Sequence, residues 1–571
     1  MQFKNFEVCV TRPYEKEYIP NNCSVISMPD GWISDAMTAE LGKVCTSRPI
    51  MIAGPTGGGK TTFAASICKF CQKHSPGKKV LLLENRTAIA TQQKIIMAKQ
   101  LKSVWAQIND PSALELITDL TGTNLTVLTY QAFVAQYRNI DLKQYDWVIL
   151  DECHYFLADS TFNATLDLLF WKIPKLLSHA HRVYLTATPG AVLPDICRAE
   201  KNNLALCGLC KRCTCASPGK LLLFSFPNHF DRVQLHYFHE INEIVDLIFS
   251  HPTERFLIFT GKREKDLDST SEMYFGAIKS AGISVSYLDR FSKKSSVWQK
   301  LCSEGMFDST ALVCTSVLDC GVSIHDPKLR HIVTEATDKT EFLQMIGRKR
   351  LRPGEILDVY IRVPGKNEII KQLDDVQKKL AIINDSFCAA RTKQMDSILF
   401  RGWIDESTNR PYAHLLNYLG NGTVYPKLTA YHYLQWRKAT LEQLLRDTDS
   451  YGDSALPRMA HEWLEQSKGY DSTQWLDFDQ KANAKAELQA FLESHLGKIV
   501  KNIPDFLRQA FSLVQKIKSF PHDETRELGY RALNNRFKAL DLPYRICKNE
   551  CEDFMVIKTD FPHLEKEAKN R

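Results

Sequence analysis

A glycine-rich segment between an apolar stretch and a helical stretch constrains the fold of this chain more than any other feature. It runs from Gly54 to Thr61, reads GPTGGGKT and follows the apolar residues IMIA. The order is therefore strand, loop and helix. A glycine-rich loop with lysine and threonine in this setting is typical of a P-loop, whose backbone N–H groups bind phosphate.

The residue types of this loop predict which atoms of a nucleotide they contact. Lys60 is long enough to reach the β- and γ-phosphates of ATP, and the hydroxyl group of Thr61 is a ligand for Mg²⁺. A glycine-rich turn before a helix is the simpler alternative, but it does not explain why Lys60 and Thr61 stand in register. The predicted nucleotide-binding residues of the loop are Gly54, Pro55, Thr56, Gly57, Gly58, Gly59, Lys60, Thr61 and Thr62.

A pair of acidic residues after a later apolar strand supplies the second half of the predicted site. The stretch YDWVILDECHYF ends its strand in Asp151 and Glu152. Asp151 is expected to hold Mg²⁺ and its water shell, and Glu152 to position and deprotonate the water that attacks ATP. Acidic pairs after strands are common, so this assignment depends on the P-loop upstream.

Six further segments accompany these two motifs. In chain order they read ENRTAIATQQK, VLTYQAF, VYLTATPG, RFLIFTGKREK, LVCTSVLDCGVSI and EFLQMIGRKRLR. Together with the P-loop and the DECH segment, the series resembles the motifs of superfamily 2 helicases of the DExH branch. The resemblance covers about residues 25 to 365 and implies two RecA-like domains that close on ATP and grip nucleic acid.

The resemblance also implies roles for residues outside the P-loop. The residues expected at the nucleic acid are Arg86, Thr129 and Thr315. Thr186 and Thr188 are expected to couple hydrolysis to strand binding, and Gly321 and Ser323 to face the nucleotide. Gln344 and Arg348 are expected to face the γ-phosphate from the second domain. The predicted catalytic residues are therefore Lys60, Asp151, Glu152, Gln344 and Arg348.

Two departures from the family pattern limit what the resemblance implies. The last motif of the family usually reads Q-R-x-G-R-x-G-R, whereas Leu351 takes the place of the second arginine here. Arg350 or Arg352 has to substitute for it, and the sequence leaves both open. In addition, the only glutamine before Gly54 is Gln2, so the adenine-reading glutamine of DEAD-box RNA helicases is missing. This favours looser selectivity for the base and argues against the DEAD-box RNA group.

Hydrophobic patterning predicts how the chain is divided. Strands alternate with helices from about Arg48 to Thr188 and again from Leu221 to Pro364, which predicts two parallel α/β sheets, and helical spacing follows. The expected divisions are an N-terminal extension (1–24), a first RecA-like domain (25–195), a cysteine-rich linker (196–220), a second RecA-like domain (221–365), a mainly helical accessory domain (366–520) and a C-terminal module (521–571).

The C-terminal module is predicted to be a helix followed by two short strands. One face of the helix is apolar, and the other carries Arg531, Asn534, Asn535 and Lys538. The runs PYRI and FMVIK then predict a hairpin. A helix before a hairpin is the closing half of a winged helix, a module that binds duplex DNA. A small domain that braces the motor is the alternative.

Four cysteines stand within the segment CGLCKRCTC, between the two predicted sheets. Pairs with the spacing Cys-x2-Cys suit tetrahedral Zn²⁺, and a zinc site here would stiffen the linker without taking part in catalysis. The spacing also resembles iron–sulfur runs, although the fourth cysteine lies unusually close, and a cluster without metal is a third alternative. The predicted zinc ligands are Cys207, Cys210, Cys213 and Cys215, and Cys197 is an alternative ligand.

The overall composition indicates in which compartment the protein works and which kinds of partner it can bind. The chain carries 17 cysteines, and its first residues lack the apolar core of a secretory signal. No apolar run approaches the length of about 18 residues that a membrane span needs. These features predict a cytoplasmic protein without a membrane partner. The net charge of +7 permits a polyanionic partner but does not require one.

These features together predict an ATP-dependent helicase or translocase that acts on nucleic acid, with DNA favoured over RNA. An ATPase that remodels or senses nucleic acid without unwinding it, or an RNA helicase, is the alternative. The segments ENRTAIATQQK and FLQMIGRKR also resemble helicases of bacterial mobile elements and phages. That resemblance implies partner proteins from a replication, transfer or defence system.

Overall fold

The computed structural model describes residues 19–558 except for a set of shorter segments. Those segments are 47, 56, 86, 108–112, 115, 162–165, 202–219, 228–229, 261–269, 290–291, 293–294, 316–321, 353, 393–403, 406–409, 419–423, 501–502, 518–528, 541 and 549–552. The chain divides into two compact units, residues 1–470 and 471–571.

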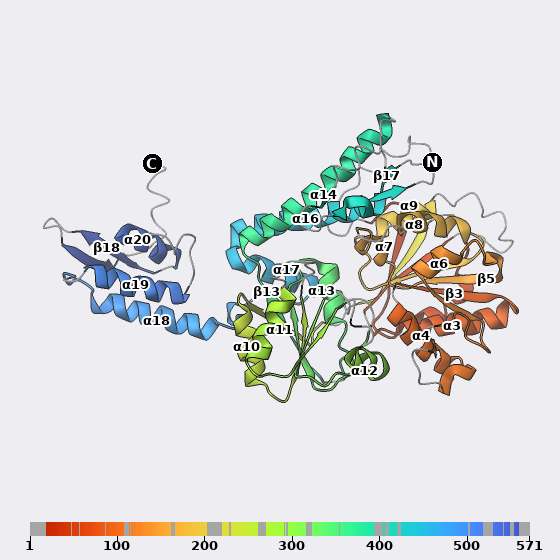
Figure 1. Ribbon diagram of the computed structural model, residues 1–571, viewed down its shortest axis with the longest axis horizontal. Coiled ribbons are helices and arrows are strands. Elements are labelled where there is room, and N and C mark those ends of the chain that lie inside the picture. The colour runs from red at the N-terminus through yellow and green to blue at the C-terminus, as the bar shows by residue number, and fades with distance from the viewer. Residues whose placement is uncertain are drawn as a thin grey trace. The chain divides into compact units, whose positions relative to one another are not determined.

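The first sheet of the larger unit has seven strands, all of them parallel (Figure 1). The strands are β1 (Cys23–Ser27), β2 (Ile50–Ala53), β3 (Lys79–Glu84), β4 (Leu125–Thr129), β5 (Tyr145–Leu150), β6 (His181–Thr186) and β7 (Leu221–Ser225), in the order β1-β7-β2-β6-β5-β3-β4. The helices of this domain are α2 (Ile33–Thr38), α3 (Lys60–His74), α4 (Thr87–Gln100), α6 (Tyr130–Gln136), α7 (Tyr155–Ala158), α8 (Leu166–Leu176) and α9 (Leu193–Lys201).

Helices cover both faces of this sheet, which explains why its inner strands, such as β2 and β3, are apolar along most of their length, whereas the edge strand β1 is partly exposed. Alternate residues of β3 enter different cores. Leu81 and Leu83 pack with the aromatic side chains of α6 and α7. Val80 and Leu82 pack with Phe63 of α3. The carboxyl ends of the central strands meet at one edge, where the P-loop and the acidic pair both lie.

The second sheet has six parallel strands in the order β10-β11-β9-β12-β13-β8. They are β8 (Val233–Phe238), β9 (Arg255–Phe259), β10 (Val285–Leu288), β11 (Ala311–Cys314), β12 (Leu329–Thr334) and β13 (Leu357–Arg362). Its helices are α10 (Ile241–Ser250), α11 (Thr270–Ser280), α12 (Ser296–Glu304) and α13 (Lys339–Ile346). The predicted fold class, two parallel α/β sheets, a helical region and a terminal hairpin, is confirmed.

One predicted strand belongs to a different sheet from the one expected. The predicted second domain, 221–365, includes β7, but β7 pairs with β1 and β2 of the first sheet, with Leu222 opposite Ser24 and Ile50. The second sheet therefore begins at β8, after the predicted boundary at 221. The first sheet begins at β1, just before the predicted boundary at 25. The pattern of apolar residues does not specify this pairing, because any buried parallel strand has the same pattern.

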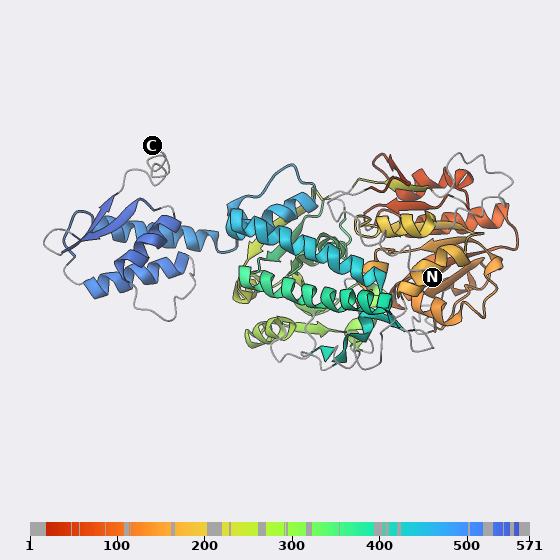
Figure 2. The ribbon, with the colours of Figure 1, turned by 90° about the horizontal axis from the view of Figure 1, so that it is seen from above.

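In the region that follows, the described residues form three α-helices and two short hairpins. The helices are α14 (Lys366–Thr392), α16 (Leu428–Tyr451) and α17 (Ala455–Trp463), and the strands are β14 (Ile404–Asp405), β15 (Arg410–Pro411), β16 (Leu416–Tyr418) and β17 (Val424–Pro426). Helices α14 and α16 lie side by side (Figure 2). Among the described residues, no helix is long and apolar enough to cross a membrane.

Helix α16 binds to both sheet domains. Near its start, the backbone N–H of Thr429 donates to the carboxylate of Asp167 of α8. His432 Nδ1 lies 2.7 Å from Asp195 Oδ1 of α9. One turn further on, Arg437 donates to the hydroxyl group of Thr337, just before α13. The helix is therefore held by the first domain at one end and by the second domain in its middle.

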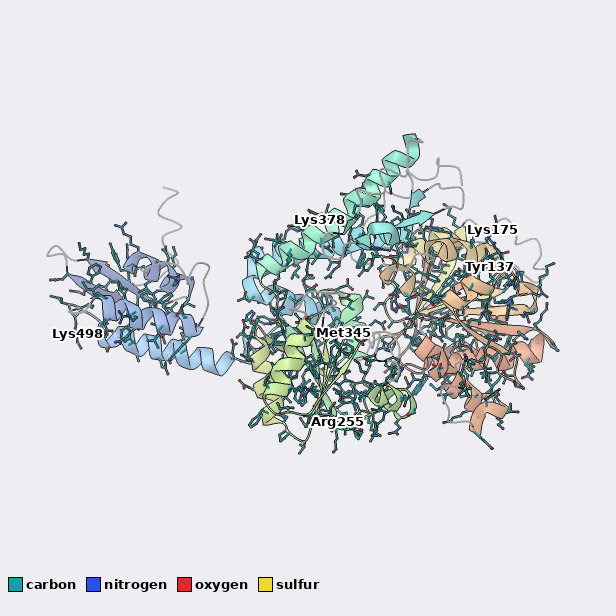
Figure 3. The ribbon with its side chains drawn as sticks, viewed as in Figure 1. Tyr137, Lys175, Arg255, Met345, Lys378 and Lys498 are labelled. Carbon is teal, nitrogen blue, oxygen red and sulfur yellow. The ribbon has the colours of Figure 1, made fainter. Side chains whose placement is uncertain are left out.

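The smaller unit consists of α18 (Phe478–Ser494), α19 (Ile503–Ile517), α20 (Tyr530–Ala539) and the antiparallel hairpin of β18 (Tyr544–Lys548) and β19 (Phe554–Lys558). Its own core joins Leu488 of α18, Val514 of α19 and Phe537 of α20 to Val556 of the hairpin. In Figure 3, Lys498 marks the segment between α18 and α19. The predicted boundary at 520 thus divides one packed unit, since α18 and α19 belong with the hairpin.

Short 3₁₀ helices complete the described structure. They are η2 (Leu41–Lys43), η3 (Val104–Gln107), η4 (Leu142–Gln144), η7 (Tyr412–Leu415), η8 (Gly452–Ser454) and η9 (Ser472–Gln474).

Candidate functional site

The P-loop joins β2 to α3, as the sequence predicts. Gly57 and Gly59 have φ angles of +85° and +92°, which only glycine adopts without strain. A Cβ atom on Gly54 would lie 2.6 Å from the terminal Cδ1 atom of Ile33, so a larger residue here would force that buried side chain to shift. Lys60 is the first residue of α3 and its ammonium group lies 3.4 Å from the carbonyl oxygen of Gly54. The ammonium group of Lys60 is thus held against the backbone of its own loop, and phosphate binding there stays a prediction.

The acidic pair follows β5 directly and faces the P-loop lysine. Glu152 Oε1 lies 3.9 Å from Lys60 Nζ, and both side chains are about nine-tenths buried. Asp151 Oδ1 accepts a hydrogen bond of 3.0 Å from the backbone N–H of Glu152. Glu152 has a φ of +46°, a strained conformation for a residue other than glycine. Strain of this kind is often found at functional sites.

The two acidic groups have different electrostatic surroundings. Burial and the neighbouring charge of Glu152 raise the pKa of Asp151 to about 6. Burial would also raise the pKa of Glu152, but Lys60, His154 and Arg348 together hold that pKa below its usual range. Glu152 is therefore charged, and its charge is stabilised from both sheet domains.

His154 connects the acidic pair to the TATPG segment. Its Nδ1 atom lies 3.3 Å from Glu152 Oε2 and 3.2 Å from the hydroxyl oxygen of Thr186. The same hydroxyl oxygen accepts a hydrogen bond of 3.0 Å from the backbone N–H of Thr188. His154 and Thr186 thus connect the segment after β6 to the carboxylate of Glu152. This contact chain fits the coupling role predicted for Thr186 and Thr188, which stays a prediction.

The second domain contributes two arginines, and their surroundings differ. Arg348 follows α13, the helix marked by Met345 in Figure 3. Its Nε and Nη2 atoms donate to the main-chain and side-chain oxygens of Gln344, both at 2.8 Å. Gln344 therefore holds the guanidinium group of Arg348 in place. The predicted direct contact of Gln344 with the γ-phosphate stays a prediction.

Arg350 is the arginine that lies against the P-loop. Its Nε and Nη2 atoms donate to the hydroxyl group of Ser323, at 3.0 and 2.7 Å. Its buried Nη1 atom has no hydrogen-bond partner among the described residues, and a Cβ atom on Gly57 would lie 2.9 Å from it. Burial and the nearby Arg348 lower the pKa of Arg350 to about 10. A buried, unpaired guanidinium nitrogen beside a phosphate-binding loop fits an anion that binds there.

The structure thus distinguishes the two substitutes that the sequence left open. The side chain of Arg352 is exposed, and its backbone N–H donates to Glu355. Lys349 Nζ donates to the carbonyl oxygen of Asp326 and lies 3.3 Å from Glu355, so it stabilises the loop. Of these three cationic side chains, Arg350 is the one that lies against the P-loop, where the second arginine of the family's last motif is expected. Ser323, predicted to face the nucleotide, orients it.

The residues predicted to contact nucleic acid are only partly described. Thr129 caps α6, because its hydroxyl oxygen accepts from the backbone N–H of Ala132 at 3.1 Å. Thr315 follows β11, and its backbone N–H donates to Leu288. Arg86 lies outside the described residues, as do Thr56 and Gly321 of the predicted nucleotide site. Their roles stay predictions.

A contact that the sequence did not reveal joins the predicted nucleic-acid segment to the acidic pair. Tyr130 is fully buried, and its hydroxyl group donates a hydrogen bond of 2.8 Å to the main-chain oxygen of Asp151. The next residue, Gln131, hydrogen-bonds to the hydroxyl group of Tyr155. The segment after β4 is therefore fixed to the segment after β5.

The four predicted zinc ligands, Cys207, Cys210, Cys213 and Cys215, all lie outside the described residues. Within the described part of the chain, no cluster of three or more His, Cys, Asp or Glu side chains has the arrangement of a metal site. Cys197, the alternative ligand, is buried in α9 close to Cys23. Zinc therefore stays a prediction.

The residues of the P-loop site fit Mg²⁺ bound together with ATP. Mg²⁺ is usually held by one or two carboxylates, substrate phosphates and water, so a dense protein cluster is not required. Asp151 supplies a buried carboxylate, and Thr61 supplies a partly exposed hydroxyl group at the start of α3. Thr62, also predicted at the nucleotide, instead accepts a hydrogen bond from Gln100 of α4.

Glu84 is the last residue of β3 and the first residue of the segment ENRTAIATQQK, and the sequence predicted no role for it. It is fully buried, and neither of its carboxyl oxygens has a hydrogen-bond partner among the described residues. A glutamate that ends the apolar run KVLLL was the available signal, since a charged residue is rarely buried without a reason. Asn85 is buried beside it, and its amide group is also without a partner in the described structure.

With this geometry in view, the chain can be compared with known families. Residues 9–191 match the family model for the res subunit of type III restriction enzymes. The match contains the P-loop and the acidic pair, so the first sheet domain is similar to the P-loop domain of that family. Among curated protein sequences, none matches this chain.

Solved structures with a similar chain path are distant in sequence. A structure of Dbp5 from S. cerevisiae bound to RNA and ADP BeF3 is 16% identical, with 55% of this chain and 79% of that chain covered and a TM-score of 0.38. A structure of the helicase Lhr from Mycobacterium smegmatis bound to ssDNA and AMP-PNP is also 16% identical. That match covers 71% of this chain and 60% of that chain, with a TM-score of 0.41.

Proposed function

We propose that this protein is a nucleic-acid-stimulated ATPase of the DExH helicase type that moves along or separates strands. One observation carries the proposal: Arg350 of the second domain presents an unpaired guanidinium nitrogen to Gly57 of the P-loop. A P-loop that also receives an arginine from another domain is suited to stabilising the charge that develops on a transferring phosphoryl group.

In this mechanism, water attacks the γ-phosphorus of ATP as the bond to the β,γ-bridging oxygen breaks. Glu152 accepts the proton of that water, and Lys60 binds the β- and γ-phosphates. When Lys60 turns from Glu152 to the phosphates, the carboxylate loses a stabilising cation and becomes a better base. Arg350, oriented by Ser323, and Arg348, oriented by Gln344, face the developing charge. Mg²⁺ bound with ATP would neutralise the phosphates beside Asp151.

Hydrolysis would be linked to movement because residues of both sheet domains form the ATP site. ATP favours the arrangement in which both domains contact it, and product release removes that preference. Residues expected at the nucleic acid belong to both domains, Thr129 to the first and Thr315 to the second. A cycle of closing and opening would therefore move these residues relative to each other along a bound strand.

Nucleic acid is the proposed partner, with DNA favoured over RNA. The adenine-reading glutamine of DEAD-box RNA helicases is absent from the described residues before the P-loop, where the chain has no Gln between 19 and 54. The family model that matches residues 9–191 is named for a restriction enzyme subunit. We also propose structural Zn²⁺ at the cysteine cluster between the sheets.

The test measures ATP hydrolysis by the full chain with single-stranded and duplex DNA and RNA, beside a strand-displacement assay. Stimulation by DNA together with displacement supports a DNA helicase, and stimulation without displacement supports a translocase or an ATPase switch. Stimulation by RNA alone would assign the protein to RNA. The absence of ATPase activity with every nucleic acid would contradict the proposal.

A further inference from the structure

Glu84 lies beside the metal-binding carboxylate predicted from the P-loop motifs. Strand β3 is the neighbour of β5, with Leu83 opposite Leu150, and the backbone N–H of Asp151 donates to the carbonyl oxygen of Leu83. Glu84 and Asp151 are the next residues after this pair, so they lie side by side at the ends of two adjacent strands. Neighbouring strands are about 4.8 Å apart, so the two side chains are close.

Alternation along the strands places both side chains on the face that α3 covers. Val80 and Leu82 of β3, and Ile149 of β5, belong to the core formed with α3. Successive side chains of a strand point to opposite faces, so Glu84 and Asp151 project to this same side. Because α3 begins with Lys60, Glu84 faces the P-loop side of the sheet rather than the nucleic-acid side.

Electrostatics agree with this placement. Burial, followed by the charges of Asp151 and Glu152, raises the pKa of Glu84 well above its usual range, and the charge of Lys60 lowers it. The carboxyl group therefore lies within the electrostatic reach of the P-loop lysine and of both acidic residues. It has no cation of its own among the described residues.

A carboxyl group in this position costs free energy. Burying a polar group without a hydrogen bond costs about 1–3 kcal/mol, and more for a charged group. Asp119, an exposed acidic residue adjoining β3, has the partners that Glu84 lacks, since its carboxylate accepts from Lys79 and from Thr126. The carboxyl group of Glu84 lacks such hydrogen bonds and lies beside the predicted nucleotide site. It is therefore suited to accept a hydrogen bond from a group that binds together with the nucleotide.

We propose that Glu84 is a positioning residue that holds, through a water molecule, the Mg²⁺ that enters with ATP. The inference rests on the proposed ATPase function and gives a role to the carboxylate that begins the segment ENRTAIATQQK. Mg²⁺ retains several of its water ligands in such sites, and these waters need acceptors.

The experiment measures equilibrium binding of a fluorescent ATP analogue to the full chain while Mg²⁺ is added, so it does not depend on turnover. Glu84→Gln keeps the size of the side chain but removes its charge. We expect the variant to need about 10-fold more Mg²⁺ for half-maximal binding, the usual effect of losing an outer-shell partner. Binding without Mg²⁺ should equal that of the wild type, and hydrolysis should recover at high Mg²⁺.

Asp119→Asn is the control, because it removes a carboxylate that contacts Lys79 at the opposite end of β3 and should leave the Mg²⁺ requirement unchanged. Glu84→Met provides a second variant without the carboxylate if Glu84→Gln does not fold. An unchanged Mg²⁺ requirement in the folded variant would contradict the inference and leave the ATPase proposal intact. Loss of hydrolysis at every Mg²⁺ concentration, with normal binding, would also contradict it, because Glu84 would then act on the attacking water. If the wild type binds no nucleotide, the proposed function itself is wrong.

Discussion

At the scale of single residues, the candidate site depends on how a few charged groups are held. Lys60, Asp151 and Glu152 come from the first domain, whereas Arg348 and Arg350 come from the second. Glu152 is the residue whose charge is stabilised from both sides, because Lys60 and Arg348 each lower its pKa. Substitutions at these residues should therefore separate nucleotide binding from hydrolysis.

The first prediction concerns Lys60 and Glu152. Lys60→Ala should abolish ATP binding or turnover, because the phosphates lose their cation. Glu152→Gln should bind ATP but hydrolyse it very slowly, since the amide cannot accept the proton of the attacking water. Nucleotide binding and phosphate release, measured separately, check both outcomes. Near-normal turnover in Glu152→Gln would exclude Glu152 as the base.

The second prediction distinguishes the two arginines. Arg350→Ala should lower kcat for ATP about 10³-fold, the usual cost of losing an arginine at a transferring phosphoryl group. Arg348→Ala should also lower kcat, because Arg348 acts on Glu152 from within the same site. Steady-state ATPase assays measure both, and Arg352→Ala is the control because its side chain is exposed. A larger loss in Arg352→Ala than in Arg350→Ala would refute this assignment.

At the scale of elements, the ends of β3, β4 and β5 bring distant segments together. The segment after β4 carries Thr129, which is predicted at the nucleic acid, and Tyr130, which bonds to the main chain of Asp151. One hydrogen bond thus links the predicted nucleic-acid segment to the predicted metal carboxylate. We therefore expect changes in the position of α6 to alter the nucleotide site.

The third prediction tests this link with Tyr130→Phe, which removes only the hydroxyl group. The basal ATPase rate should stay within about 2-fold of the wild type, but its stimulation by nucleic acid should fall about 5-fold, the lower end of typical coupling between sites. ATPase assays with and without nucleic acid measure the ratio. Tyr137→Phe is the control, because that hydroxyl group lies at the surface end of the same helix. Equal stimulation in both variants would mean that the hydrogen bond carries no coupling.

At the scale of the whole molecule, the chain consists of a unit with both sheets and a separate unit with its own core. The exposed face of α20 carries Arg531, Asn535 and Lys538, which were predicted to contact DNA. Asn534 does not belong to that face, because its side chain donates to and accepts from the backbone of Ile546 in the hairpin. It fixes the helix to the hairpin instead.

The fourth prediction is that removing residues 471–571 weakens duplex DNA binding and flattens its salt dependence, because cationic contacts to phosphate are lost. The basal ATPase rate should remain largely intact, since both sheets belong to the other unit. Ending the chain at 520 instead would leave α18 and α19 without the helix and hairpin that complete their core. Equal DNA affinity of the shortened and full chains at the same salt would support a bracing role for this unit.

The fifth prediction is that the purified protein carries about one Zn²⁺ per chain, lost when Cys207 and Cys210 are both changed to Ser. The metal would be structural, so chelation should lower the thermal stability more than the ATPase rate at low temperature. Elemental analysis of both proteins measures it. A brown protein that contains iron, or a protein without metal, would exclude zinc.

The sequence by itself determined the parts of this protein that are built from neighbouring residues. The P-loop, the acidic pair and the strand-helix alternation are local patterns, because phosphate binding and sheet formation each need contiguous residues of a given type. Only the tertiary structure decided the rest. It placed β7 in the first sheet, placed Arg350 rather than Arg352 at the P-loop, and placed Glu84 beside Asp151. These features depend on which distant segments pack together, and the type of a residue alone does not determine which residues lie next to it in the folded protein.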